Sequence, residues 1–259
     1  TSRSSGTKAF SLTGAVQRTG LCEVPMGTTL RELVFEIGGG TLPGRTFKAV
    51  QTGGPSGGCL PASQLDLPVD FDALAEAGSM MGSGGMIVLD EEDCMVDFAR
   101  YFVEFLREES GGKCAPCRLG LPQLSALLEK VTRGEAEAAD LDAIESVAKT
   151  MGDNSLCGLG KSAPNPVLST LQYFREEYEA HLAGRCPAGV CRELVEYRIT
   201  DDCTGCLACL RACPTQTIEG AKKELHHIVQ EGCTQCGVCR AVCHYEAVEV
   251  LSGGEVVVA

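Results

Sequence analysis

The chain has 259 residues, of which 44% are apolar and 22% are charged, and its formal net charge at pH 7 is −13. This composition is typical of a folded chain of about two or three domains, and the excess of acidic residues argues against a nucleic-acid-binding surface. No apolar run approaches the ~20 residues that a membrane-spanning helix needs, and the polar N-terminal segment shows no secretory signal. We therefore expect a cytoplasmic protein that has no membrane span and binds no nucleic acid.

The first third of the chain alternates between strand and helix signals. Residues 8–16 alternate like a strand, residues 28–34 open a short helix with Thr28 as its cap, and residues 47–50 form another strand. The glycine-rich loop that follows lacks the Gly-Lys-Ser/Thr ending of a phosphate-binding loop. These signals predict a small mixed α/β module over residues 8–87.

Residues 88–183 carry four apolar stripes at helical spacing. The stripes lie in residues 95–106, 121–131, 141–151 and 167–178. Four amphipathic helices with short connections predict a small four-helix bundle, so the whole chain is expected to be an α+β multidomain protein.

A C-x2-C pair precedes the second stripe. It consists of Cys114 and Cys117, and Cys157 follows in a Ser-Leu-Cys-Gly-Leu-Gly segment. One such pair with a single distant cysteine is compatible with a redox dithiol, a zinc site or an iron–sulfur site.

A third group of metal-ligand residue types follows the helical stripes. Cys186 and Cys191 flank a Pro-Ala-Gly-Val knuckle, and His181 lies five residues before Cys186. With Cys94 as the fourth ligand they would form a tetrahedral zinc site. The alternative is a pair of free, packed thiols beside a helix-terminal histidine. In either case residues 184–200 are expected to link the bundle to the last domain.

The last part of the chain carries the most specific signal, a cysteine run that occurs twice. Each run has the spacing C-x2-C-x2-C-x3-C, which is typical of bacterial ferredoxins with two 4Fe-4S clusters, where the fourth cysteine of each run binds the other cluster. The first cluster is thus assigned to Cys203, Cys206, Cys209 and Cys243. The second cluster is assigned to Cys233, Cys236, Cys239 and Cys213. Neither zinc nor disulfides explain this repeat, so residues 201–259 are predicted to be a two-cluster ferredoxin domain.

Several specific strings resemble one family of redox subunits. They are the segments 51–59, 109–118, 155–160 and 163–168. They resemble the flavin-carrying, NADH-oxidising subunit of respiratory complex I. They resemble still more the beta subunit of NAD(P)-dependent, often electron-bifurcating FeFe-hydrogenases, which has the same ferredoxin tail.

The resemblance implies a fold and a set of cofactors for each part of the chain. It implies a β-grasp fold of the soluble-ligand-binding type for residues 8–87 and an iron–sulfur site at Cys114, Cys117 and Cys157. It places FMN and NAD(P) on a preceding domain, of which residues 1–7 would be the end.

One position departs from the family pattern. The family has a further cysteine three residues before the one that matches Cys114, and here that position is Gly111. The fourth iron of this middle cluster would then be bound by water, by hydroxide, by a side chain such as Ser110, or by a cysteine from elsewhere in the fold. Alternatively, the fourth iron is absent and the cluster has three irons.

The resemblance implies that the chain relays single electrons rather than providing acid, base or nucleophile. Its implied partners are a hydrogenase or similar catalytic subunit, a small 2Fe-2S subunit and a ferredoxin. Two alternatives remain at this point. The chain could be the same module from an NAD-linked formate dehydrogenase, or a zinc-clamped structural scaffold whose middle cluster is inactive.

Overall fold

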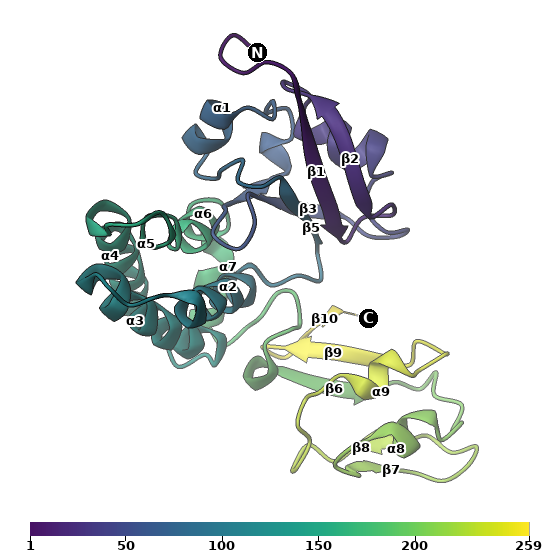
Figure 1. The fold of residues 1–259 in the computed structure, drawn as a ribbon. Coiled ribbons are helices and arrows are strands. Elements are labelled where there is room, and N and C mark those ends of the chain that lie inside the picture. Colours follow the sequence, from purple (N-terminus) through teal and green to yellow (C-terminus); the bar gives the residue numbers. More distant parts are fainter. Residues whose placement is uncertain (259) are drawn as a thin grey trace.

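Three sets of secondary-structure elements follow one another along the chain in the computed structural model, which describes residues 1–258 (Figure 1). The first set is a sheet with short helices, the second is entirely helical, and the third is a small α/β unit. Each set has its own apolar core. The expectation of a mixed α+β chain is therefore confirmed.

The first region is a five-stranded mixed sheet. Its elements are β1 (Thr7–Gly14), β2 (Gly20–Pro25), η1 (Glu32–Ile37), β3 (Phe47–Thr52), β4 (Cys59–Pro61), η2 (Ala62–Gln64), α1 (Phe71–Glu76) and β5 (Gly85–Asp90). The strand order is β2-β1-β5-β3-β4, and β1 pairs with β5 in parallel whereas the other neighbours are antiparallel. Phe10 and Leu12 alternate inward from β1 and share a core with Leu33 and Val34 of η1. The alternation predicted for the first strand is therefore observed.

The capping residue before the short helix that follows β2 lies one position later than predicted. Thr29, not Thr28, makes the capping contacts: Glu32 N donates to Thr29 Oγ1 at 3.1 Å, and Thr29 N donates to a Glu32 carboxylate oxygen at 2.7 Å. This reciprocal pair requires a threonine three residues before a glutamate. Thr28 instead donates its hydroxyl to the Pro25 carbonyl.

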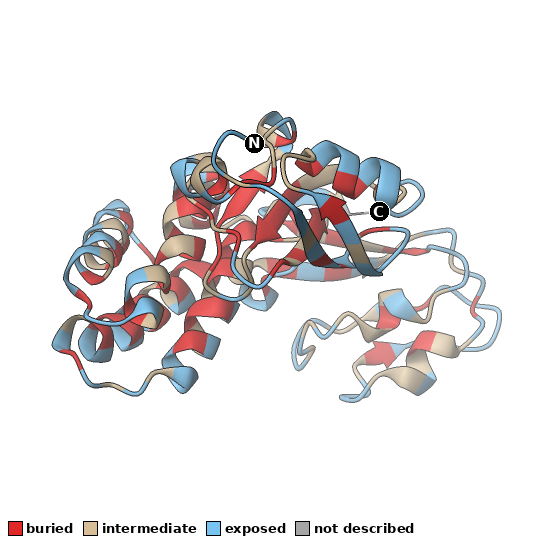
Figure 2. Cartoon of the chain, turned by 45° about the horizontal axis from the view of Figure 1, so that its top comes forward, coloured by how far each residue is buried: buried red, intermediate tan, exposed pale blue. Residues whose placement is uncertain are grey.

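The second region is helical. Its elements are α2 (Met95–Glu109), α3 (Ala115–Thr132), α4 (Ala138–Asn154), α5 (Gly158–Ser162), α6 (Asn165–Tyr173) and α7 (Arg175–Leu182). The buried side chains of the long helices meet in one core, which includes Val103, Leu124, Leu128, Ile144 and Val167. The buried residues gather inside this region and under the sheet (Figure 2).

The fourth predicted helix is divided in two. Phe174 leaves the helical conformation, with φ −135° and ψ 35°, and it both ends α6 and precedes α7. Its side chain is buried with Ala49, Cys59 and Met95, where the sheet meets the helices. The apolar periodicity continues across this break, so the sequence pattern alone predicts one helix where tertiary packing produces two.

The third region contains two small sheets and two short helices. Its elements are η3 (Arg192–Leu194), β6 (Val195–Ile199), α8 (Ala208–Ala212), β7 (Ile218–Glu219), β8 (His227–Ile228), α9 (Val238–Ala241), β9 (Val248–Ser252) and β10 (Glu255–Val258). One antiparallel sheet has the order β10-β9-β6, and β7 pairs with β8. In residues 1–258, no helix is both long and apolar enough to cross a membrane.

Candidate iron–sulfur and metal-binding sites

One cavity of the third region lies beside α8. It is lined by four cysteines, namely Cys203, Cys206, Cys209 and Cys243. The first three come from the loop into α8 and from its first turn, and the fourth comes from the segment that follows α9.

A second cavity lies beside α9. Its cysteines are Cys233, Cys236, Cys239 and Cys213. Three of them come from the loop into α9 and from its first turn, and Cys213 directly follows α8. Each cavity thus receives three sulfurs from one cysteine run and one sulfur from the other run, in the same grouping that the spacing predicts.

The backbone at each loop explains this exchange. Leu207, with φ 69°, and Gly237, with φ 74°, take the left-handed conformation directly before α8 and α9. The turn lets each loop curl around its cavity before the helix begins, and the short helix carries the fourth cysteine away from that loop to the neighbouring cavity. Gly237 also lacks a side chain that would meet Tyr197, because a Cβ there would lie 2.9 Å from the Tyr197 hydroxyl.

The sulfurs of these two cavities differ in their surroundings. Burial raises the pKa of Cys239 to about 11 and also raises the pKa of Cys209. Burial acts in the same direction on Cys213, but hydrogen bonds from Thr217 and Thr215 outweigh it and lower the pKa of Cys213 to about 7. Hydroxyl and N–H donors next to sulfur stabilise the thiolate form, which is the form that binds iron.

The three cysteines of the middle motif lie at the starts of two helices. Cys114 directly precedes α3, Cys117 lies in the first turn of α3, and Cys157 directly precedes α5. The two helix starts are packed together, since a Cβ on Gly160 would lie 3.3 Å from Cβ of Cys117. Backbone N–H groups, first that of Leu156, lower the pKa of Cys114.

The structure shows what surrounds the position where the family pattern has a fourth cysteine. A Cβ on Gly111 would meet nothing within 4 Å. The neighbouring Ser110 places its Oγ 3.1 Å from Sγ of Cys117 and accepts a hydrogen bond from Gly112 N. Cys59 is not available for this role, because it is buried in the cluster between the sheet and the helices. Ser110 therefore offers a hydroxyl oxygen beside the sulfur of Cys117.

The histidine and three cysteines of the predicted zinc site lie together in the fold. Cys94, His181, Cys186 and Cys191 are all buried, and their ligand atoms lie within 4.8 Å of one another. Cys94 Sγ is 3.4 Å from His181 Nε2 and 3.8 Å from Cys191 Sγ, and His181 Nε2 is 3.2 Å from Cys191 Sγ. A tetrahedral zinc ion with ordinary bond lengths requires sulfurs about 3.8 Å apart and sulfur–nitrogen separations of about 3.5 Å. The distances therefore fit zinc.

The protonation of this group also favours a cation. The Glu177 carbonyl accepts from Nδ1 of His181 at 2.6 Å, so the proton lies on Nδ1 and the lone pair of Nε2 faces the sulfurs. Hydrogen bonds from Cys191 and Cys94 lower the pKa of Cys186 and in turn raise the pKa of Cys191, and burial raises the pKa of Cys94, so one thiolate lies among two thiols. A buried thiolate needs a positive partner, which a divalent cation would supply.

Three separate parts of the chain meet at this group. Cys94 caps the start of α2, His181 lies in the last turn of α7, and Cys186 and Cys191 lie in the loop before η3. Cys186 N also donates to Ser252 Oγ of β9 at 2.8 Å. The group therefore joins the helical region to the third region.

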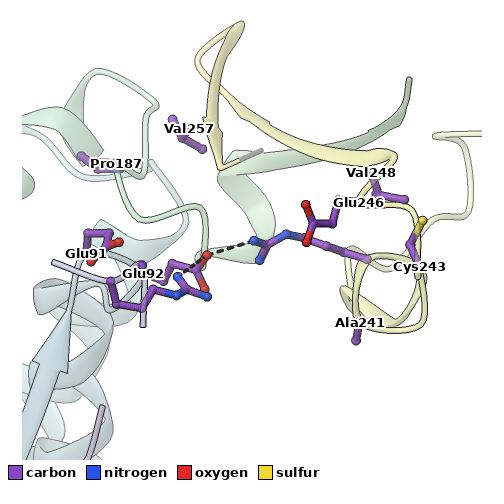
Figure 3. A pocket seen from close by; sticks show the side chains of 11 residues that line it. Glu91, Glu92, Pro187, Ala241, Cys243, Glu246, Val248 and Val257 are labelled. Atoms are coloured by element: carbon purple, nitrogen blue, oxygen red, sulfur yellow. Dashed lines mark hydrogen bonds and ion pairs between the residues drawn. The ribbon is translucent and has the colours of Figure 1, made fainter. Parts of the chain in front are cut away.

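A second contact joins the third region to the rest of the chain. The Glu92 carboxylate pairs with Arg240 of α9 at 2.9 Å and also with Arg45. Figure 3 shows these pairs in a cleft between the regions, with Cys243 on the wall opposite Glu92. Arg240 lies next to Cys239, so this ion pair lies close to a cysteine-lined cavity.

Sequence reasoning missed two contacts of the cysteine sulfurs. His226 Nδ1 lies 3.5 Å from Cys209 Sγ, and Thr217 Oγ1 lies 3.5 Å from Cys213 Sγ. Thr217 could have been found, because it lies four residues after a predicted ligand. His226 belongs to no motif, and no sequence signal points to it.

Three family models match the chain. Residues 10–60 match the SLBB domain, residues 97–181 match the NADH-ubiquinone oxidoreductase-F iron-sulfur binding region, and residues 196–244 match the 4Fe-4S dicluster domain. They follow one another in the order of the three regions of the fold.

Two curated relatives cover most of the chain. The NADP-reducing hydrogenase subunit HndC of Solidesulfovibrio fructosivorans is 51% identical over 228 residues, which are 87% of this chain and 46% of the relative. An NADH-quinone oxidoreductase subunit of Rhizobium meliloti is 45% identical over 186 residues, which are 71% of this chain and 44% of the relative. The chain is thus a homologue of these hydrogenase and NADH-quinone oxidoreductase subunits.

These similarities confirm the resemblance that the motifs indicate, including the soluble-ligand-binding module. The chain spans less than half the length of these two relatives. A solved structure agrees with the assignment: NAD+-reducing [NiFe]-hydrogenase in the H2-reduced state matches with a TM-score of 0.63 and 36% identity. The match covers 70% of this chain and 30% of the hydrogenase chain.

Proposed function

We propose that the chain is the electron-conducting portion of an NAD(P)-linked oxidoreductase subunit. The observation that carries this proposal is the pair of cavities that are each lined by four cysteines drawn from both runs. Iron–sulfur clusters supply one-electron transfer when bound in such sites. The proposed units are residues 8–87, 88–183 and 201–259, and residues 184–200 connect the last two units and contribute β6 to the sheet of the third region.

In this proposal the cysteine thiolates bind iron, and hydrogen-bond donors near the sulfurs stabilise their negative charge. One 4Fe-4S cluster is assigned to Cys203, Cys206, Cys209 and Cys243, and the other to Cys233, Cys236, Cys239 and Cys213. The left-handed residues Leu207 and Gly237 orient the cysteine-bearing loops before α8 and α9. Cys209 and Cys239 are buried whereas Cys206 and Cys236 are exposed, so each cluster would have one side in the protein interior and one side near solvent, which tunes its potential.

A third iron–sulfur site is assigned to Cys114, Cys117 and Cys157. Ser110 is its fourth protein ligand in this proposal, because its hydroxyl lies beside Cys117 whereas Gly111 offers no ligand atom. An oxygen ligand in place of sulfur changes the charge and the potential of the site.

A zinc ion is assigned to Cys94, His181, Cys186 and Cys191, and its role is structural. All four positions are taken by protein side chains, which is typical of structural zinc rather than of catalytic zinc with an open position. The ion would hold the third region against the helical region.

The flavin and nicotinamide sites are proposed to lie outside these 259 residues. The names of the relatives point to NADP, NADH and NAD+ as electron donors or acceptors of the complete proteins. The proposed partners are the other subunits of a multi-subunit complex, among them a hydrogenase or similar catalytic subunit and a small 2Fe-2S subunit, together with a soluble ferredoxin.

The first test is to measure iron, acid-labile sulfide and zinc per chain under anaerobic conditions, followed by a redox titration. About 12 iron per chain is expected for three four-iron clusters, about 11 for a three-iron middle cluster, and about 8 for the ferredoxin domain alone. About one zinc is expected at the Cys/His group. A well-folded chain without iron, or with iron that cannot be reduced, would contradict the electron-relay function.

A further inference from the structure

His226 has the surroundings of a residue that acts on a cysteine sulfur. It is 1% exposed, and its Nδ1 lies 3.5 Å from Cys209 Sγ. Gly220 leaves room for the imidazole, because a Cβ at Gly220 would lie 2.2 Å from Cδ2 of His226. Within residues 1–258, its Nε2 is buried and has no hydrogen-bond partner. Buried polar atoms are normally paired. Because Nε2 has no partner, the contact between Nδ1 and Cys209 Sγ is the polar contact that fits the imidazole to this site.

The chemistry of the sulfur fixes the direction of this hydrogen bond. A cysteine binds iron as the thiolate, which accepts hydrogen bonds and has no proton to donate. The proton shared by Cys209 and His226 therefore lies on Nδ1, and the imidazole is the donor.

The second cavity has a different set of side-chain donors. Thr217 and Thr215 place their hydroxyls 3.5 Å and 3.6 Å from Cys213 Sγ. In the other half of the internal repeat, Tyr245 and Ala247 occupy the equivalent positions. The two halves of the domain are thus alike in their cysteines but not in the side chains that donate to them.

We propose that His226 is a positioning residue that raises the reduction potential of the cluster bound by Cys209, independently of the other cluster. An extra electron adds negative charge to the iron and its sulfurs, and a donor N–H stabilises that charge more than it stabilises the oxidised state. Thr217 acts in the same way on the cluster bound by Cys213. The inference rests on the proposed function, since it requires both clusters to be present.

The test uses the full chain with its clusters, prepared anaerobically, and EPR-monitored potentiometric titration at one fixed pH. His226→Phe keeps a planar ring but removes the N–H, and Thr217→Val keeps the branched shape but removes the hydroxyl. His226→Phe is expected to shift one cluster's reduction equilibrium toward the oxidised form by about tenfold, which is about 59 mV for one electron. Thr217→Val is expected to shift the other cluster in the same direction. Each variant thus leaves one cluster as an internal control.

His226→Asn is the conservative rescue, because its amide N–H can occupy the position of Nδ1. It is expected to keep the potential close to that of the unsubstituted chain. Unchanged potentials in His226→Phe, equal shifts of both clusters, or a shift in His226→Asn as large as in His226→Phe would each overturn the proposal. Iron content per chain shows that both clusters are present in every variant.

A measurement on the unsubstituted chain covers the case in which His226→Phe loses its cluster. With 15N-labelled histidine, pulsed EPR of the reduced chain is expected to detect a 15N coupling transmitted through the N–H to sulfur contact. Absence of this coupling overturns the role of His226. Absence of any reducible iron–sulfur signal would instead contradict the proposed function itself.

Discussion

The Glu177 carbonyl oxygen accepts a hydrogen bond from Nδ1 of His181 at 2.6 Å, and the Glu177 carboxylate pairs with Lys48 at 2.7 Å. The same carboxylate accepts from Met95 N, directly after Cys94. One residue thus orients the histidine of the Cys/His group, caps the helix that begins beside another of its cysteines, and binds the neighbouring sheet. The Cys/His group is therefore fixed to the first region as well as to the third.

Replacement of His181 by alanine is expected to abolish zinc binding. The substitution removes one of four ligands and leaves three buried thiols with no cation to neutralise a thiolate. Elemental analysis should find about one zinc per chain before the substitution and less than about one tenth afterwards. His227→Ala is the matched control, because His227 is exposed and pairs only with Glu219 among the described residues. Full zinc retention in His181→Ala would contradict the assignment.

Lys48→Met is expected to destabilise the chain by about 3–5 kcal/mol, because it leaves the buried Glu177 carboxylate without its cation. The side chains of Lys48 and Glu177 are only 17% and 7% exposed. Urea unfolding of the metal-loaded chain measures the change. In the control Arg198→Met, an exposed pair with Glu249 is lost, and a cost below about 1 kcal/mol is expected. If both variants lower the free energy of unfolding by the same amount, burial does not strengthen the contribution of the Lys48–Glu177 pair to stability.

Gly111→Cys is expected to strengthen the middle iron–sulfur site. Nothing lies within 4 Å of a Cβ at this position, so the side chain can be accommodated. A thiolate there would replace an oxygen ligand, and the variant should keep about 12 iron per chain under mild oxidation where the unsubstituted chain falls to about 11. Gly111→Ala adds the Cβ without the sulfur and should behave like the unsubstituted chain. Equal iron loss in the Cys and Ala variants would show that position 111 does not reach the cluster.

The Glu92 ion pairs are expected to stabilise the third region in a pH-dependent manner. Burial raises the pKa of Glu92, but Arg45 and Arg240 outweigh this effect and lower it below 4.5. Because the pKa is lower in the folded state than in the unfolded state, the stabilisation is present above pH 4.5 and is lost as the pH falls through the folded-state pKa.

Glu92→Gln tests this pair by thermal unfolding of the loaded chain at a series of pH values. At pH 7 a loss of about 0.5–1 kcal/mol is expected for a half-buried surface pair, and the difference from the unsubstituted chain should shrink as the pH falls below 4.5. A difference that stays constant with pH would exclude the ionised carboxylate as its cause.

The sequence by itself determined the parts of the sites that depend on local spacing. The two runs that begin at Cys203 and Cys233 each lie in one loop and one short helix, so residue spacing alone groups their sulfurs. The strand at residues 8–16 and the helices that begin near Met95 and Ala138 follow from the periodicity of apolar residues, because one face of each is buried.

Tertiary structure decided what lies far apart in the chain. Packing of α2 against α7 brings Cys94 to His181, although 87 residues separate them. Burial of Phe174 against the sheet divides a helix whose periodicity is unbroken. His226 reaches Cys209 because Gly220 lets its ring pack closely. Such contacts depend on how whole helices and strands pack against one another. Residue spacing and apolar periodicity describe single elements and therefore do not predict this packing.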